Sequence, residues 1–158
     1  MKPLGSEENA SRDKLKLLVD TCFLLSALGV EVEREVLEAI GCFHLAEVYY
    51  VEACLLEAVL TIMEAVSAED VDVVRRGLES VKKSYNLAIP PLEAYIEAYE
   101  MYLNGHEDYV DNLAYSTSKS LNLTFLTDNE EFIDFLKENG YSLDLVMTPR
   151  ELINNLRG

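Results

Sequence analysis

The chain of 158 residues contains no tryptophan, four prolines and three cysteines, and its basic residues are few. Thirteen Lys and Arg stand against 29 Asp and Glu, which gives a formal net charge of −16 at pH 7. A protein with this charge repels nucleic acid at long range unless metal ions or a local basic patch intervene. The composition therefore excludes a broad electrostatic clamp for DNA.

The three cysteines, Cys22, Cys42 and Cys54, are odd in number, have no CxxC spacing and lie among apolar neighbours. This pattern predicts buried thiols in a reducing compartment and no disulfides. No uncharged run reaches the roughly 18 residues that a membrane span needs. The stretch 14–29 could pass for a secretory signal, but Asp20 interrupts its apolar part. We therefore expect a cytoplasmic protein without a membrane segment.

Hydrophobic residues make up 49% of the chain, enough for one core. We expect a flexible polar tail at 1–13 and a single domain at 14–158. Apolar periodicity predicts helices at 21–28, 31–40, 52–66, 70–84, 92–103, 106–121, 130–138 and 149–156. Short apolar runs predict strands at 15–19, 47–51, 86–89, 123–127 and 144–147. This alternation lacks tight hairpin signals, so it predicts a three-layer α/β/α fold with a mainly parallel central sheet.

Acidic residues follow two of the expected strands. Asp20 ends the strand at 15–19 and Asp128 ends the strand at 123–127. Because ligands of open parallel sheets bind beyond the carboxyl ends of the strands, these carboxylates are candidate site residues. Asp111 falls in the first turns of the helix before the second of these strands, and Glu57 interrupts an apolar helix. Glu57 also fits an ordinary solvated helix stripe.

Carboxylates that converge without histidine or cysteine partners form a site of hard oxygen ligands. Such a site suits Mg²⁺ or Mn²⁺ rather than zinc. A bound metal orients a water, lowers the pKa of that water and neutralises the charge that develops on a phosphodiester. The protein then needs neither a nucleophilic side chain nor a large basic surface.

Four segments carry these acids in a fixed order: Asp20-Thr21 within 17–25, Glu57 within 54–60, Asp111 at the start of 111–118, and Asp128 within 125–132. In order and spacing they resemble the PIN-domain family, small metal-dependent ribonucleases that include the VapC-type toxins of toxin–antitoxin pairs. The resemblance implies a PIN-like fold and an endoribonuclease in which Asp20, Glu57, Asp111 and Asp128 form the catalytic metal site. It also implies a homodimer and, for a toxin, an antitoxin whose C-terminal segment occupies the acidic groove.

The fourth segment departs from the family pattern, because Asn129 stands where Asp is commonest. Asp128, Asn129 acting through water, and Glu131 are the alternatives for the fourth ligand, and we favour Asp128. A haloacid-dehalogenase-type phosphatase also begins with a strand-end Asp, but it requires a second Asp where this chain has Cys22. The remaining alternative is a catalytically inactive PIN-like module that serves in interaction or scaffolding.

Other noticeable residues have ordinary interpretations. The basic cluster Arg75, Arg76, Lys82 and Lys83 could touch RNA phosphate, although a solvated helix face is favoured. The tyrosines Tyr95, Tyr99 and Tyr102 share a helical spacing that is typical of a core or a dimer interface. Cys42, His44 and His106 lack zinc-ligand spacing and are expected to be structural.

Overall fold

The computed structural model describes residues 14–65 and 71–157. The expected N-terminal tail at 1–13 lies outside the described residues. Within the described part, five parallel strands form one sheet in the order β3-β2-β1-β4-β5. The strands are β1 (Leu15–Val19), β2 (Ala46–Tyr50), β3 (Asn86–Leu87), β4 (Thr124–Leu126) and β5 (Val146–Met147). The expected parallel sheet is therefore confirmed.

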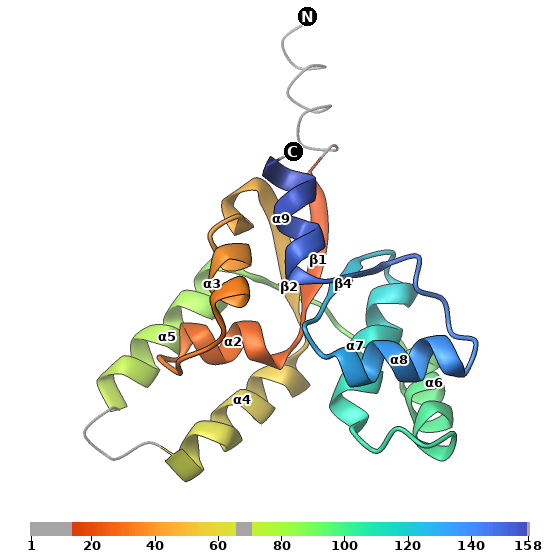
Figure 1. The fold of residues 1–158 in the computed structure, drawn as a ribbon. Helices are drawn as coiled ribbons and strands as arrows, with labels where there is room; N and C mark the ends of the chain where they lie inside the picture. The colour runs from red at the N-terminus through yellow and green to blue at the C-terminus, as the bar shows by residue number, and fades with distance from the viewer. Residues whose placement is uncertain (1–13, 66–70, 158) are drawn as a thin grey trace, which may run out of the picture.

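Helices cover both faces of this sheet (Figure 1). They are α2 (Thr21–Ala27), α3 (Arg34–Ile40), α4 (Glu52–Ala65), α5 (Val71–Ser84), α6 (Leu92–Leu103), α7 (Tyr109–Ser120), α8 (Glu130–Glu138) and α9 (Pro149–Arg157), with a 3-10 turn at Phe43–Leu45. Helices α2, α3 and α5 lie on one side of the sheet, and α6, α7 and α8 lie on the other. Helix α4 leaves the carboxyl end of β2 and packs against α2 and α7. The three layers agree with the sequence prediction.

The structure shortens some expected elements for local reasons. The helix expected at 106–121 begins at Tyr109, because the Asp108 side chain accepts a hydrogen bond from Asp111 N and caps it. The same helix ends before Asn122, whose φ of 57° is left-handed. The strand expected at 144–147 is reduced to Val146–Met147.

Strand β1 lies at the centre of the hydrophobic core. Its residues Leu17, Leu18 and Val19 are completely buried, as expected for a central strand that is covered on both faces. Val19 pairs with Leu126 of β4, and Leu18 pairs with Phe125. The carboxyl ends of β1 and β4 are thus level, so the residues that follow them lie side by side.

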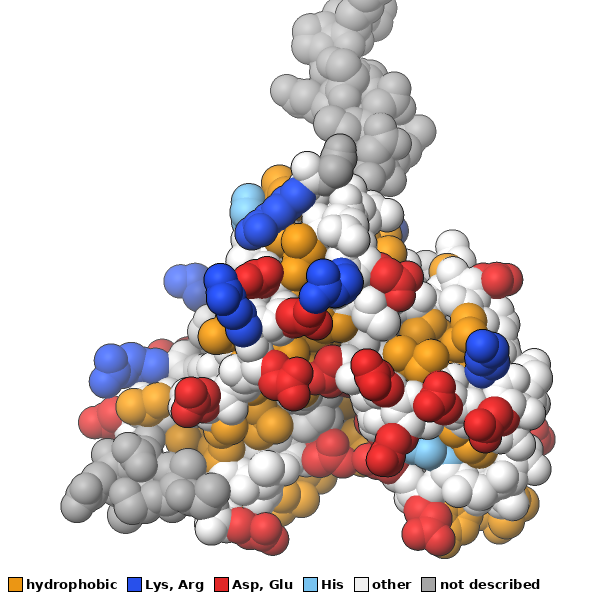
Figure 2. All heavy atoms as spheres, viewed as in Figure 1, with side chains coloured by type: hydrophobic (Ala, Val, Ile, Leu, Met, Phe, Trp, Pro, Cys, Tyr) orange, Lys and Arg blue, Asp and Glu red, His pale blue; other side chains and the backbone are white. Residues whose placement is uncertain are grey.

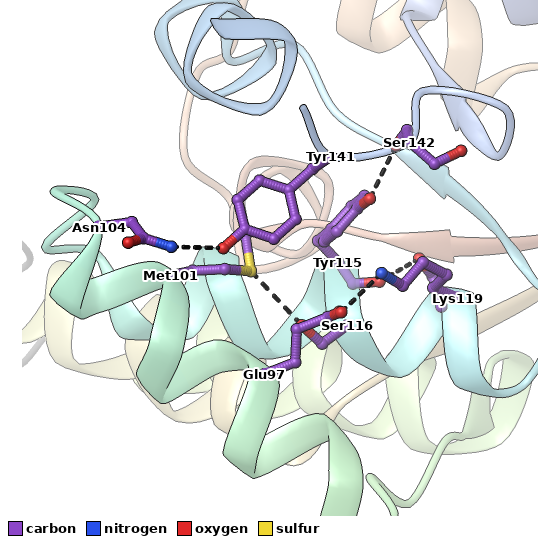
Figure 3. A network of polar contacts seen from close by, with 9 residues as sticks. Glu97, Met101, Asn104, Tyr115, Ser116, Lys119, Tyr141 and Ser142 are labelled. Atoms are coloured by element: carbon purple, nitrogen blue, oxygen red, sulfur yellow. Dashed lines mark hydrogen bonds and ion pairs between the residues drawn. The ribbon is translucent and has the colours of Figure 1, made fainter. Parts of the chain in front are cut away.

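Polar contacts fix α7 against α6 and against the segment that follows α8 (Figure 3). On α7, the Tyr115 hydroxyl donates to Ser142 O (2.7 Å), and Lys119 Nζ pairs with Glu97 Oε2 of α6 (2.6 Å). Asn104 Nδ2, at the end of α6, donates to the Tyr141 hydroxyl (2.9 Å). Helix α7 carries Asp111 near its start. These contacts therefore help to hold the helix that carries one of the expected site residues.

Within residues 14–65 and 71–157, no helix combines the length and the hydropathy that crossing a membrane requires.

Gly77 allows α5 to approach the end of α2 closely. A Cβ atom at this position would lie 2.3 Å from Ala27 O and 2.9 Å from Leu28 Cα. Replacing a helical glycine by alanine normally stabilises a protein by about 1 kcal/mol. Here we predict that Gly77→Ala lowers the free energy of unfolding by about 1–3 kcal/mol, because the backbones must separate. Urea denaturation measures this change.

Arg76→Ala, at an exposed position of the same helix, is the control and should change stability little. A Gly77→Ala protein that is more stable than wild type would show that the two backbones do not meet as described.

Candidate metal centre

All four acids predicted from the sequence line a single cavity of about 340 Å³. The cavity lies beyond the carboxyl ends of β1 and β4 and is open to solvent, where Thr61 and Asp108 are exposed. Its lining consists of Asp20, Thr21, Cys22, Leu25, Glu57, Thr61, Asp108, Asp111, Asp128 and Asn129. The fold therefore brings together carboxylates from four separate segments of the chain.

Asp20 is held by the end of β4 and by the first turn of α2. Its backbone N donates to Leu126 O of β4 (3.1 Å), and its side chain accepts from Cys22 N (3.2 Å) as the N-cap of α2. Thr127 Oγ1 donates to Asp20 Oδ2 at 2.5 Å. Burial raises the pKa of Asp20 to about 6, and Asp128 adds to the rise. The carboxylate is thus fixed in place although it is costly to ionise.

Among the carboxyl groups of the cavity, that of Asp111 has the most strongly raised pKa. Only 8% of the residue is exposed, and burial together with Asp108, Asp20 and Glu57 raises its pKa to about 8. Asn129 Nδ2 donates to Asp111 Oδ2 (3.1 Å), while Asn129 Oδ1 accepts from Phe132 N and caps α8. An aspartate at position 129 could not donate this bond. The Asn129 side chain therefore stabilises the Asp111 carboxylate by a hydrogen bond, whereas a second carboxylate at this position would repel it.

Glu57 is half-buried on α4 and faces the cavity. Burial raises the pKa of its carboxyl group, and Asp108 contributes. A fully solvated stripe, which the sequence also allowed, does not explain this burial. The nearby Thr21 hydroxyl moderates the rise in the Glu57 pKa, but this hydroxyl is buried and has no partner in good hydrogen-bond geometry.

The sequence pattern predicts a buried thiol at Cys22, but this residue lies beside the candidate acids. The side chain is only partly buried and lines the cavity. Its Sγ lies 2.9 Å from Asp20 Oδ1 and 3.2 Å from Asp128 Oδ1. Burial and the two carboxylates raise the pKa of the thiol. Cys42 and Cys54 are buried as expected, and all three cysteines are free thiols.

The three alternatives for the fourth metal ligand, Asp128, Asn129 and Glu131, differ in where their side chains lie. Asp128 and Asn129 both line the cavity. Glu131 is exposed and is absent from the lining. Asp128 is in contact with Cys22, whereas Asn129 is in contact with Asp111. Geometry therefore favours Asp128 as an additional charged oxygen ligand.

The donor set fits a divalent cation. Several carboxylates with raised pKa values and an unpaired buried hydroxyl share one cavity, which is the arrangement that a cation would relieve. Acidic side chains gather across the middle of the face in Figure 2, near the hollow between α4 and α8. A larger cavity, of about 820 Å³, is lined by Lys14 and Lys16 but by no carboxylate. It offers no comparable chemistry.

The remaining candidates lie outside the cavity lining. On α5, Arg75 pairs with Asp72 and Lys82 pairs with Glu52, at exposed positions. The His106 ring packs 4.7 Å from the Phe132 ring, between centroids, and hydrogen-bonds Asn112. These contacts agree with a solvated helix face and a structural histidine.

No protein-family model and no curated protein sequence matches this chain. Several solved structures are similar to it, including the following two. The crystal structure of FitAcB from Neisseria gonorrhoeae has a TM-score of 0.61 and 16% identity, and the match covers 85% of this chain and 98% of that chain. The structure of FitAB bound to an IR36 DNA fragment has a TM-score of 0.60 and 17% identity, with 84% and 94% covered. With the observed layers, this similarity confirms the predicted fold class, a three-layer α/β/α fold with a parallel central sheet.

The raised pKa of Asp111 predicts a pH-dependent stability for the metal-free protein. The pKa rises from 3.8 to about 8 on folding, so the folded state binds more protons and stability falls as the pH rises through this interval. Asp111→Asn should therefore stabilise the metal-free protein at pH 8, on the order of 1–3 kcal/mol. The gain should vanish below about pH 4, and urea denaturation at several pH values measures it.

Glu138→Gln removes one exposed carboxylate from α8, outside the cavity, and serves as the control. A stability difference between Asp111→Asn and wild type that stays constant from pH 4 to pH 8 would contradict the stated cause.

Proposed function

We propose that this protein is a metal-dependent endoribonuclease of the PIN type that hydrolyses RNA phosphodiester bonds. The observation that carries the proposal is the convergence of Asp20, Glu57, Asp111 and Asp128 on one cavity at the carboxyl edge of the parallel sheet. The motif order of the sequence and the PIN-like fold support the same assignment.

These four acids would hold the cation, and their oxygen ligands favour Mg²⁺ or Mn²⁺. Such an ion supplies an activated water and neutralises charge on the scissile phosphate. The side chains of the protein keep the acids in place: Thr127 orients Asp20, and Asn129 orients Asp111. The acids set the geometry and do not act as nucleophiles.

The antitoxin partner that the family resemblance implies for a toxin is supported by charge. An open cavity lined with acids, in a chain of net charge −16, attracts a basic segment of another protein. In one of the similar structures, FitAB is bound to a DNA fragment. A basic partner would allow the present chain to join a comparable assembly although its own surface repels nucleic acid.

The proposed homodimer has a candidate surface on α6. Six large apolar side chains form a stripe along this helix, and each is between 45% and 72% exposed: Leu92, Tyr95, Ile96, Tyr99, Tyr102 and Leu103. Core packing of the three tyrosines, one of the two sequence interpretations, is therefore wrong. The spacing is that of a helix which packs against another helix, and we infer that the stripe pairs with a second copy.

The decisive activity assay compares wild type with Asp20→Asn on labelled RNA, with Mn²⁺, with Mg²⁺ or with chelator. Asparagine can still cap α2, so the variant should fold. We predict that cleavage requires a metal and falls by roughly 100-fold or more in Asp20→Asn. Glu138→Gln, purified in parallel, should cleave like wild type.

Equal cleavage by wild type and Asp20→Asn would point to a contaminating nuclease and remove the support for this site. Absence of cleavage from protein that has been unfolded, freed of partners and refolded would favour the alternative of an inactive PIN-like interaction or scaffold module.

The dimer is tested by light scattering of the eluting protein. Wild type should have twice the 17.8 kDa mass of the chain. The fraction of dimer should increase at high salt, because salt screens the repulsion between two chains of charge −16. Tyr99→Glu should elute as a monomer. The control, Leu37→Glu on the exposed face of α3, should remain a dimer. A monomeric wild-type protein at all salt concentrations would exclude this role for α6.

A further inference from the structure

The thiol of Cys22 is a potential metal ligand that the proposed function does not use. Its Sγ lies between the carboxylates of Asp20 and Asp128, and one ligand atom from each of the three residues lies within 4.8 Å of the others. Each of the three side chains lines the same cavity. One cation can therefore contact sulfur and two carboxylate oxygens with small side-chain adjustments.

A second observation indicates that this cavity receives a ligand. The Thr21 hydroxyl, on a residue that is only 8% exposed, is buried without a hydrogen-bond partner, and Thr21 lines the cavity. Unpaired buried hydroxyls are costly and rare. A bound cation with its waters would give this oxygen a partner.

Sulfur changes which cation such a site prefers. Thiolate is a ligand for Zn²⁺ and for chemically similar ions such as Co²⁺ and Cd²⁺, whereas Mg²⁺ takes oxygen ligands almost exclusively. A set of one thiolate and two carboxylates is compatible with the four-coordinate geometry of zinc, with water in the fourth position.

We propose that Cys22, Asp20 and Asp128 together bind a zinc-class divalent cation, and that such a cation displaces Mg²⁺ or Mn²⁺ and thereby inhibits the enzyme. On binding, the Cys22 S–H bond breaks, the proton passes to solvent, and a sulfur–metal bond forms without any change of oxidation state. The inhibition depends on the function proposed above, whereas the binding does not.

The test uses Co²⁺ as the probe, added to the reduced, metal-free full chain. A thiolate bound to Co²⁺ gives a charge-transfer absorption band in the near ultraviolet, which oxygen ligands do not give. We expect this band in wild type and its loss in Cys22→Ser, together with at least about a 10-fold weaker affinity for Co²⁺.

Cys42→Ser and Cys54→Ser are the matched controls, because they replace the buried thiols that do not line the cavity. Both should retain the band. Loss of the band in Cys54→Ser and not in Cys22→Ser would overturn the assignment. The wild-type spectrum is informative even if Cys22→Ser does not fold.

Two further outcomes separate this inference from the proposed function. Binding of Co²⁺ without a thiolate band, if abolished by Asp20→Asn, would overturn the role of Cys22 and leave the oxygen-ligand site intact. Absence of any Co²⁺ binding, measured by absorption and by thermal stabilisation, would overturn both.

Discussion

The burial of several carboxylates close to one another is the constraint on which the rest of the site depends. Burial and neighbouring charge raise the pKa of Asp20 to about 6 and that of Asp111 to about 8. The ionised form of such carboxyl groups is unfavourable in the metal-free protein and becomes favourable when a bound cation neutralises the charge. The neighbouring hydrogen-bond donors reduce the cost, with Thr127 bonded to Asp20 and Asn129 bonded to Asp111.

The fold determines which acids meet. The parallel register of β1 and β4 makes Val19 level with Leu126, so Asp20 and Asp128 follow at the same edge. Helix α7 brings Asp111 to this edge, and its capping by Asp108 sets the position of its first turn. The site therefore rests on an apolar sheet and on the contacts that hold α7.

Much of the fold could be predicted, because strands such as Leu15–Val19 are short apolar runs and α6 ends before Asn104 and Gly105. The convergence of the four acids followed from parallel strand topology together with the motif order. The contacts of Cys22 with two carboxylates and the bridge made by Asn129 could not be predicted, because they depend on distances across the chain. The exposure of the α6 tyrosines could not be predicted either, because an apolar stripe on a helix is typical of both a core and an interface.

The central claim is that the carboxylates of this cavity bind a divalent cation. The most direct measurement is calorimetric titration of metal-free wild type and Asp111→Asn with Mn²⁺, at pH 7, in two buffers of different ionisation enthalpy. The raised pKa values predict that wild type binds Mn²⁺ and releases protons, and that Asp111→Asn binds more weakly and releases fewer. Equal affinity and equal proton release in the two proteins would contradict the account.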